Sequence, residues 1–390
     1  MVIAVGKVAA DRMQSVRNQR KLRVRVGRNH AIAYNILHGQ RNASFVSGPT
    51  NPLLRVSRRL DGISFPGGGY DLVHTFNSIP LLTNCPFVVT FEDYAPRLPE
   101  DRPMPLLAPF LRRRLTSSQC IALVAMSSYA VRQMKYQHRT HPSDLVKLTA
   151  KTKIIYPGIQ RTRQAPKRLS GTPLKLLFVG GDFFRKGGPA LVRAHLALRK
   201  AGIAVQTTVV SSLAWSVDDY VGPPDLSAVR KSLGDLDADG IVLHRQLSNE
   251  NVKELMQQAD FLVLPTLHDT FGYVSIEAMA AGTPVIATAT CAQVEIVKHN
   301  ESGFLLDFEN DAEVGKWSWL YGQNLPGYVE AYWSTIELLA QSIITQIQVL
   351  YEDRSDYERL SAGALTRIQN KFCVEHARGR LEEIYSQVCA

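Results

Sequence analysis

The sequence predicts an α/β protein with two doubly wound domains, and three observations support this prediction. Short apolar runs alternate with helix-like stretches along most of the chain, a pattern typical of βαβ units in parallel sheets. The length of 390 residues suits two or three domains. A polar segment rich in breaker residues, 160–173, lies between the two halves and predicts a linker. We therefore expect one domain in residues 1–165 and another in residues 171–372.

The strands of the first domain are expected at short, continuous apolar runs, which are typical of strands buried on both faces of a parallel sheet. These runs are 22–26, 71–74, 86–91, 121–126 and 153–156. The second domain alternates more regularly, with strands expected at 174–179, 205–210, 241–244, 261–264 and 284–287, and helices at 189–200, 249–258 and 271–281. Residues 356–388 predict two further helices. Since open α/β sheets bind ligands beyond the carboxyl ends of their strands, we expect a site in a cleft between the domains.

The composition is that of an ordinary globular protein, with 45% hydrophobic and 21% charged residues, which excludes disordered and collagenous classes. The five cysteines are scattered without metal-binding spacing, which favours a reducing compartment; they are Cys85, Cys120, Cys291, Cys373 and Cys389. No apolar run approaches the roughly 20 residues of a membrane span, and the first residues lack the pattern of a secretion signal. The sequence therefore predicts a cytoplasmic protein, with no metal or cofactor.

The charge is distributed unevenly between the two halves. Residues 1–170 hold 27 Lys and Arg against 8 Asp and Glu, a net charge of +19, whereas residues 171–390 hold 18 against 27, a net charge of −9. The basic residues are not interleaved with stacking aromatics, so we expect no nucleic acid partner. The basic runs 17–28 and 110–115 fit an anionic membrane surface, with the protein peripheral on its inner face. A solvated basic face is the alternative.

The most specific motif spans residues 268–287. An apolar run ends at Pro265, a polar loop carries Asp269, and Gly272 comes directly before the next expected helix. The N-terminus of a helix offers free N–H groups and a positive dipole end, which suit a phosphate. Glu277 follows within the first turns of this helix, so two carboxylates are available to sugar hydroxyls.

A second motif, at residues 178–188, also lies where an expected strand gives way to a helix. It places Arg185 and Lys186 before a pair of glycines. Two adjacent basic residues at such a turn more often form a solvated surface. Because these two lie in the same domain as Asp269 and Glu277, we interpret them as phosphate ligands rather than as a solvated turn.

Together these motifs resemble the family 4 retaining glycosyltransferases of the GT-B fold, the glycosyl transferases group 1 type. The family's E-x7-E pair corresponds to Asp269 and Glu277, with Asp in place of the first Glu, and its F-V-G-R-x4-K-G loop corresponds to residues 178–187. The resemblance implies two Rossmann-like domains facing across a cleft, the first on the acceptor side and the second binding the nucleotide sugar. It also implies that a last helix, from about residue 373 to 390, crosses back onto the first domain.

The resemblance assigns donor-binding roles to named positions. Asp269 would contact the donor sugar, Glu277 the ribose, and Lys186 the diphosphate, whose growing charge it would neutralise. The family arginine of the second motif is Gly181 here, and Arg185 is the expected substitute. The backbone beside the diphosphate corresponds to Phe271, Gly272, Tyr273 and Val274.

On the acceptor side the resemblance is weaker. Where relatives carry a histidine in a T-x-H-D pattern this chain has Glu92, a carboxylate suited to stabilise an oxocarbenium-like transition state; a solvated loop acid is the alternative. The nearest counterpart of the family's glycine-rich loop is Gly27, Arg28 and Asn29. His74 lies at an expected strand end and is either a structural histidine or a residue of the acceptor side.

The implied activity is transfer of a hexose from a UDP-, GDP- or ADP-linked donor to the hydroxyl of a glycan or lipid-linked acceptor, with retention of configuration. It would serve glycan, polysaccharide or glycolipid synthesis. The alternative is a non-catalytic GT-B module that binds a nucleotide sugar or a partner subunit. An aromatic-rich segment, 317–333, predicts either a satellite core or an exposed acceptor or partner surface.

Overall fold

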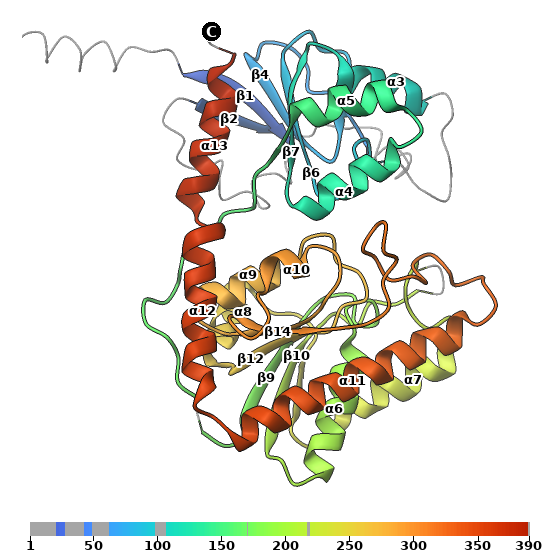
Figure 1. The fold of residues 1–390 in the computed structure, drawn as a ribbon, viewed down its shortest axis with the longest axis vertical. Helices are drawn as coiled ribbons and strands as arrows, with labels where there is room; N and C mark the ends of the chain where they lie inside the picture. Colours follow the sequence, from blue (N-terminus) through green and yellow to red (C-terminus); the bar gives the residue numbers. More distant parts are fainter. Residues whose placement is uncertain are drawn as a thin grey trace, which may run out of the picture. The chain divides into compact units, whose positions relative to one another are not determined.

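A computed structural model describes six ranges of the chain: 21–27, 43–48, 62–97, 107–169, 171–216 and 219–388. These ranges divide into two units (Figure 1). The first unit holds the described residues of 1–126, 137–158 and 374–390, and the second unit holds those of 127–136 and 159–373. Each unit is described by itself below.

The first unit is built on a parallel sheet with six strands in the described ranges, in the order β2-β1-β4-β6-β7-β8. The strands are β1 (Leu22–Gly27), β2 (Ala43–Gly48), β4 (Leu72–Phe76), β6 (Phe87–Phe91), β7 (Cys120–Ala125) and β8 (Thr152–Ile154). Two short strands, β3 (Ile63–Ser64) and β5 (Ile79–Pro80), pair with each other. The helices of this unit are α3 (Leu107–Thr116), α5 (Pro142–Lys151) and α13 (Val374–Ser386), whereas α4 (Ser128–Gln137) belongs up to Tyr136 to the second unit.

The second unit contains a parallel sheet that, over the residues described, has the order β11-β10-β9-β12-β13-β14. Its strands are β9 (Leu174–Val179), β10 (Val205–Val210), β11 (Ile241–His244), β12 (Phe261–Leu264), β13 (Val285–Thr288) and β14 (Gly303–Leu306). In chain order this is 3-2-1-4-5-6, the arrangement of a doubly wound sheet, in which the order reverses between β9 and β12. Ligands of such sheets bind beyond the carboxyl ends of the strands at that reversal.

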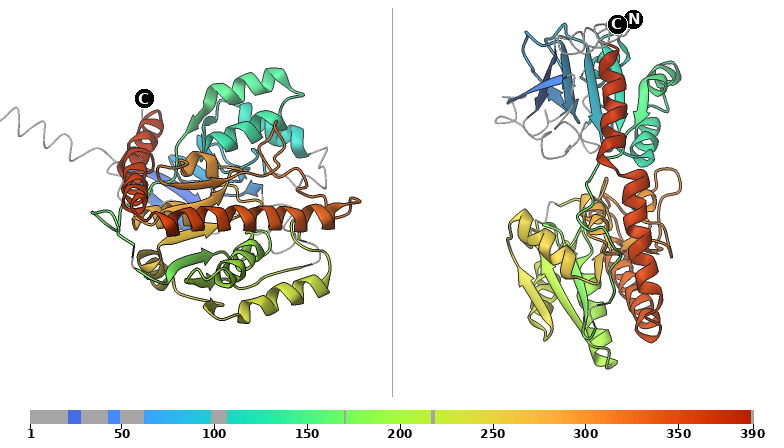
Figure 2. Two further views of the ribbon diagram at one scale, coloured as in Figure 1. Left: turned by 60° about the horizontal axis from the view of Figure 1, so that its bottom comes forward. Right: turned by 90° about the vertical axis from the view of Figure 1, so that its left-hand side faces the viewer.

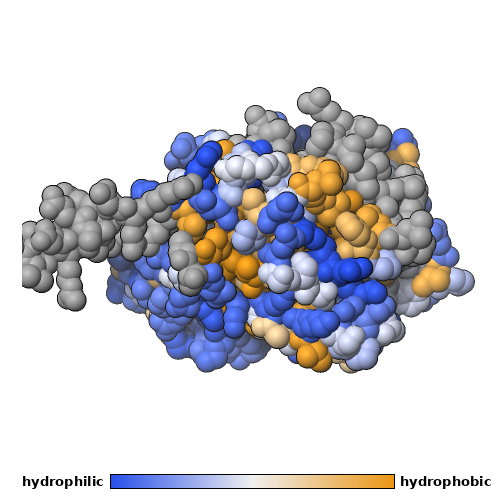
Figure 3. All heavy atoms as spheres, turned by 90° about the horizontal axis from the view of Figure 1, so that it is seen from above, coloured by the Kyte–Doolittle hydropathy of each residue, from blue (hydrophilic) through white to orange (hydrophobic). Residues whose placement is uncertain are grey.

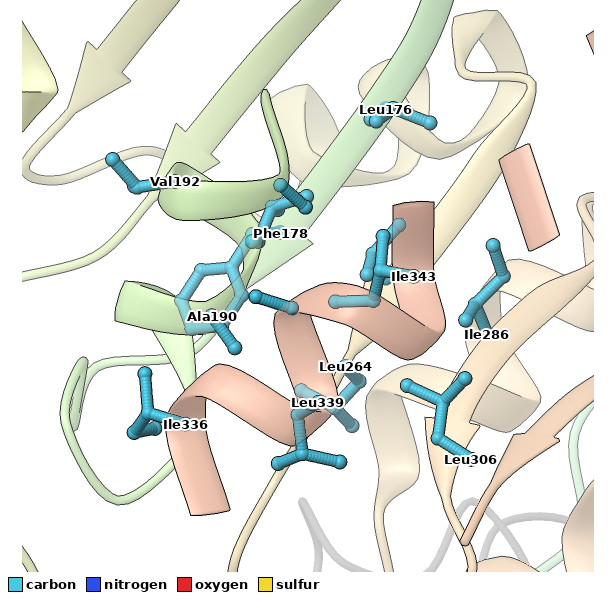
Figure 4. Close-up of a cluster of buried hydrophobic side chains, with 14 of the residues drawn as sticks. Leu176, Phe178, Ala190, Val192, Leu264, Ile286, Leu306, Ile336, Leu339 and Ile343 are labelled. Carbon is cyan, nitrogen blue, oxygen red and sulfur yellow. The ribbon is translucent and has the colours of Figure 1, made fainter. Parts of the chain in front are cut away.

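Helices cover both faces of the second sheet (Figures 1 and 2). They are α6 (Gly188–Lys200), α7 (Leu226–Gly234), α8 (Asn249–Gln258), α9 (Tyr273–Ala280), α10 (Gln293–Ile296), α11 (Tyr328–Glu352) and α12 (Asp356–Lys371). Burial on both faces explains why β12 and β13 are continuous apolar runs with every residue buried. Side chains from strands and from the helices α6 and α11 meet in one core (Figure 4).

The predicted α/β class with two parallel sheets is confirmed. The 25-residue helix α11 is absent from the sequence prediction, and it changes the interpretation of the aromatic segment. Trp317, Tyr328 and Tyr332 are at most 1% exposed, and they belong to the same cluster as the strands of the second sheet. They form part of the main core of this unit, so the expectation of a satellite core is wrong for these residues. Tyr321 is 44% exposed.

The segment expected as a linker packs against the second unit. The Lys167 side chain is buried, and its ammonium group donates to the carbonyl of Ala259 and, at 3.0 Å, to Thr283 Oγ1. Its backbone N–H donates to Ser361 Oγ at 2.7 Å. Burial lowers the pKa of Lys167 to about 8, against the opposing effect of Asp260. These contacts fix residues 160–169 as a part of the second unit, which resumes at Ile159.

No helix in the described part of the chain combines the length and apolar character that a membrane span requires.

Candidate functional site

The two sequence motifs become neighbours at the point where the second sheet reverses its strand order. One follows β9 as loop 180–187, and the other follows β12 as loop 265–272. The N–H of Leu267 donates to the carbonyl of Arg185 at 3.0 Å, so the backbones of the two loops are tied together. The topology thus explains why residues more than 80 positions apart in the sequence form one site.

Lys186 and Asp269 form an ion pair across these loops, between Nζ and Oδ2. The two side chains are 14% and 17% exposed, so the pair is shielded but still reaches the surface. Partial burial strengthens the attraction between such charges relative to an exposed pair. The structure therefore holds a cation and a carboxylate side by side, where an anionic ligand can compete for the cation.

Glycines shape the turn that follows Lys186. Gly187 has φ +74°, and a Cβ at this position would lie 1.8 Å from the carbonyl oxygen of Pro265. A side chain is thus excluded both by backbone conformation and by the close approach of the second loop. Helix α6 begins directly afterwards without a side-chain cap at its N-terminus.

Gly272 likewise forms a tight turn, at the start of α9, that excludes a side chain. Its φ is +91°, and an added Cβ would lie 1.9 Å from Gln293 Nε2. No side chain caps the N-terminus of α9, whose first backbone N–H groups lack carbonyl partners within the helix. Phe271 is buried before this turn, while Tyr273 and Val274 are half-buried after it. The turn therefore presents backbone donors and the positive end of a helix dipole, as an anion requires.

Glu277 lies one turn further along α9 and is half-buried. Among the described residues its carboxylate has no hydrogen-bond or ion-pair partner. Burial raises the pKa of Glu277 above its usual value, and Lys253 opposes this shift. A half-buried carboxylate with unused acceptor sites is suited to bind hydroxyl groups of a ligand.

Arg185 is engaged inside the protein. Its Nε donates to Asp182 Oδ2 at 2.6 Å, and a terminal nitrogen donates to the carbonyl of His268 at 2.9 Å. Burial lowers the pKa of Arg185, but Tyr220 and Asp182 outweigh this effect and raise the pKa above its usual value. This charged guanidinium thus joins the two loops, and the prediction from the sequence that it binds a phosphate is not supported by these contacts. Gly181 is exposed, and its carbonyl accepts a hydrogen bond from Ser212 Oγ at 2.9 Å.

In the first unit, Glu92 follows β6. Its Oε1 accepts hydrogen bonds from Asn77 Nδ2 at 2.9 Å and from Arg97 at 3.1 Å, and its backbone N–H donates to Asn77 Oδ1 at 3.2 Å. Glu92 is therefore a bonded loop acid rather than a solvated one. Its suggested part in stabilising a transition state stays a prediction.

The contacts of His74 show that it is a structural histidine. The side chain is fully buried in β4, and its two ring nitrogens are hydrogen-bonded to Tyr385 Oη at 2.5 Å and to Thr90 Oγ1 at 2.7 Å. Tyr385 belongs to α13, so His74 fastens the last helix to the first sheet. The assignment of His74 to the acceptor side is thereby corrected, because no surface of this side chain remains for a ligand. Gly27 ends β1, while Arg28 and Asn29 lie outside the described residues.

Two aromatic residues lie beside the site: Tyr220 is absent from the sequence prediction, and Tyr321 belongs to the aromatic segment 317–333 considered there. Tyr220, from the loop after β10, lies against His268 with ring centroids 5.7 Å apart, and the Arg185 guanidinium lies 5.7 Å from its ring centroid. Tyr321 stacks on Tyr220. Their proximity depends on how two loops fold, and no spacing in the sequence shows it. The structure shows no group of three or more potential metal ligands among the residues it describes.

Comparison with known proteins relates this site to one family. The model of the family "Glycosyl transferases group 1" matches residues 159–316, which include both loops. Curated relatives include a D-inositol 3-phosphate glycosyltransferase from Salinispora arenicola, 28% identical over 42% of this chain and 40% of its own length. A protein of the same name from Arthrobacter sp. is 26% identical over 63% of this chain and 55% of its own. The chain thus spans about half the length of these relatives.

Solved structures resemble the chain over nearly its whole length. A glycosyltransferase from Rickettsia africae has a TM-score of 0.61 and 16% identity, covering 95% of this chain and 99% of its own. Anabaena HepE in complex with UDP-glucose has a TM-score of 0.59 and 14% identity, covering 94% and 100%. At these identities the likeness concerns the fold, and it confirms the predicted GT-B fold.

Proposed function

We propose that this chain transfers a hexosyl group from a nucleoside diphosphate sugar to an acceptor hydroxyl with retention of configuration. The match of residues 159–316 to the glycosyl transferases group 1 supports this proposal. The observation that carries the proposal is the Lys186–Asp269 pair at the reversal of the second sheet, beside the uncapped start of α9. The complex of Anabaena HepE with UDP-glucose supports a nucleotide sugar as the donor.

In the proposed reaction the diphosphate binds where the two loops meet. Lys186 exchanges its contact with Asp269 for a phosphate oxygen, and the first N–H groups of α9 bind the remaining charge. Asp269, released from the lysine, accepts hydrogen bonds from the donor sugar, and Glu277 accepts them from the ribose. As the bond between sugar and phosphate breaks, negative charge grows on the diphosphate, and its attraction to Lys186 strengthens most in the transition state.

Retention follows if the acceptor hydroxyl attacks from the face that the diphosphate leaves. The leaving phosphate oxygen then takes the proton of that hydroxyl, so the step needs no nucleophile from the protein. Glu92 already accepts hydrogen bonds from Asn77 and Arg97. Because the Glu92 carboxylate is engaged in this way, the main catalytic contribution falls to Lys186.

The acceptor is proposed to be a glycan or a lipid-linked saccharide, in keeping with the basic first half of the chain. Helix α3 exposes Phe110, but two of its three arginines are engaged within the first unit. Arg112 pairs with Asp144 at 2.8 Å, and Arg114 donates to the carbonyls of Pro80 and Thr83. Because these two arginines are engaged, attachment to an anionic membrane would depend on fewer free charges than the sequence indicates. Polar and apolar side chains are interspersed on the face seen in Figure 3.

A second candidate is a module that binds the nucleotide sugar without turning it over. The engaged Arg185 favours it, because this guanidinium already bonds Asp182 and His268 and so offers less charge to a leaving diphosphate. Turnover separates the two candidates, since a binding module releases no nucleoside diphosphate.

The test is a screen of UDP-, GDP- and ADP-sugars by calorimetry, followed by measurement of released nucleoside diphosphate with a panel of saccharide acceptors. We expect one donor to bind and to be consumed. Lys186→Ala should weaken binding and strongly lower turnover, whereas Lys200→Ala, at the exposed end of α6, should leave both intact. Binding without release supports the module. Failure of every nucleoside diphosphate to bind contradicts both candidates.

A further inference from the structure

A stacked pair of tyrosine rings lies beside the site and has no part in the function proposed above. Tyr220 and Tyr321 stack with ring centroids 5.2 Å apart and an angle of 29° between the rings. The backbone N–H of Tyr321 donates to the carbonyl of Tyr220 at 3.3 Å, which fixes the two loops against each other. The pair is thus held by backbone as well as by ring contact.

The stability of the core does not explain why an aromatic residue occupies position 321. Its φ is +65°, in the left-handed region that an L-residue other than glycine or asparagine adopts at a cost in free energy. The side chain is 44% exposed, while the neighbouring Trp317 and Tyr328 supply the buried aromatic contacts. Non-glycine residues held in this region of backbone conformation cluster at functional sites.

The inner ring connects this pair to the acid of the site. Tyr220 lies edge-on to His268, and its hydroxyl is 3.3 Å from His268 Nδ1. His268 directly precedes Asp269, which pairs with Lys186. The stack therefore lies next to the loop whose carboxylate is proposed to bind the donor sugar, whereas Glu277, proposed for the ribose, lies within α9.

We propose that the Tyr220–Tyr321 stack is a platform for a glycosyl ring at the sugar end of the site. The face of Tyr321 that is turned away from Tyr220 provides apolar area for the C–H surface of a pyranose, while Tyr220, which also contacts Arg185 and His268, supports this ring from behind. Because the two rings are held in place, little conformational entropy is lost when a sugar binds. This inference rests on the proposed function, and it adds residues that select the glycosyl group.

The test compares Tyr321→Ala with Leu325→Ala, an exposed residue of the same segment, in the full chain. Saturation-transfer NMR is recorded with UDP, UDP-glucose and methyl α-glucoside, together with the equivalent GDP-mannose and ADP-glucose series. Calorimetry gives the dissociation constants. Thermal melting of each variant checks that the fold is intact.

We expect Tyr321→Ala to weaken binding of the nucleotide sugar about tenfold and to leave binding of the nucleoside diphosphate unchanged, with no effect of Leu325→Ala. If only the methyl glycoside signal or the KM for a saccharide acceptor changes, the ring bound is that of the acceptor, and the platform stands. An equal loss for UDP and UDP-glucose, or no change in any saccharide signal, overturns the platform. If the unaltered chain binds no nucleoside diphosphate, the proposed function fails, and the methyl glycoside signal still decides the platform.

Discussion

The carboxyl edges of the two sheets use their polar residues differently. In the first unit, His74 is bonded through its two ring nitrogens, and the Glu92 carboxylate accepts from Asn77 and Arg97. In the second unit, Glu277 has no hydrogen-bond or ion-pair partner within the described ranges, and Lys186 pairs with Asp269 at the surface of the turn. The first edge holds its own unit together, while the second edge retains unused capacity to bind.

This contrast shows which features distinguish a sheet edge that binds a ligand from one that only stabilises its unit, although both sheets have the same α/β architecture. Polar residues after strand ends occur in both sheets, so their position alone does not identify a site. What distinguishes the second unit is an uncapped helix start, a glycine held at positive φ by a close neighbour, and a half-buried acid that bonds no other described residue. The uncapped helix start and the half-buried acid each cost stability unless a ligand completes them.

The largest expected effect comes from Lys186. Lys186→Ala removes the charge proposed to stabilise the leaving diphosphate, and we expect kcat to fall about 100- to 1,000-fold, as for the loss of a single oxyanion-stabilising donor. Steady-state release of nucleoside diphosphate measures this change. Lys186→Arg should recover part of the rate, since the charge remains but the fork geometry differs. Equal rates in Lys186→Ala and the unaltered chain would remove Lys186 from the reaction.

The sequence predicts the second unit better than the first, for physical reasons. Strands such as 174–179 and 261–264 are short apolar runs buried on both faces, so their pattern depends little on the rest of the fold. The loops around Lys186 and Asp269 are anchored by glycines whose need for space leaves a signal in the sequence. By contrast, the stacking of Tyr220 on Tyr321, the bonding of Arg185 and the burial of His74 under Tyr385 depend on contacts distant in sequence.

Gly272→Ala should have the second-largest effect. The new methyl group would meet Gln293 Nε2, and the residue would have to adopt φ +91°. We expect the free energy of unfolding to fall by about 2 to 3 kcal/mol, together with loss of nucleoside diphosphate binding. Urea unfolding and calorimetry measure the two effects. Gly234→Ala, at the end of α7, is the control, because a Cβ there meets no atom within 4 Å. Similar losses in both variants would show that the turn at Gly272 is not special.

His74→Ala tests the structural edge. It leaves the buried hydroxyls of Tyr385 and Thr90 without their histidine partner and opens a cavity, so we expect a loss of about 2 kcal/mol in unfolding free energy. Nucleoside diphosphate affinity should not change. Tyr385→Phe removes one of the two bonds and should cost about 1 kcal/mol. A weaker dissociation constant in a His74→Ala protein that is still folded would place this histidine in the binding machinery after all.

Glu277→Gln should have the smallest effect, and its sign depends on pH. Burial raises the folded-state pKa of Glu277 above its ordinary value of 4.5, so between these two values the folded chain binds more protons than the unfolded chain. Stability conferred by this group therefore falls as pH rises through that window. The amide of the Glu277→Gln variant carries no charge to desolvate, so thermal melting should give a higher Tm than the unaltered chain at pH 8 and no difference below about pH 4. Glu254→Gln, an exposed position on α8, is the control. A Tm at pH 8 that falls on Glu277→Gln would mean that the carboxylate has a stabilising partner in the protein, and its availability to a ligand would be disproved.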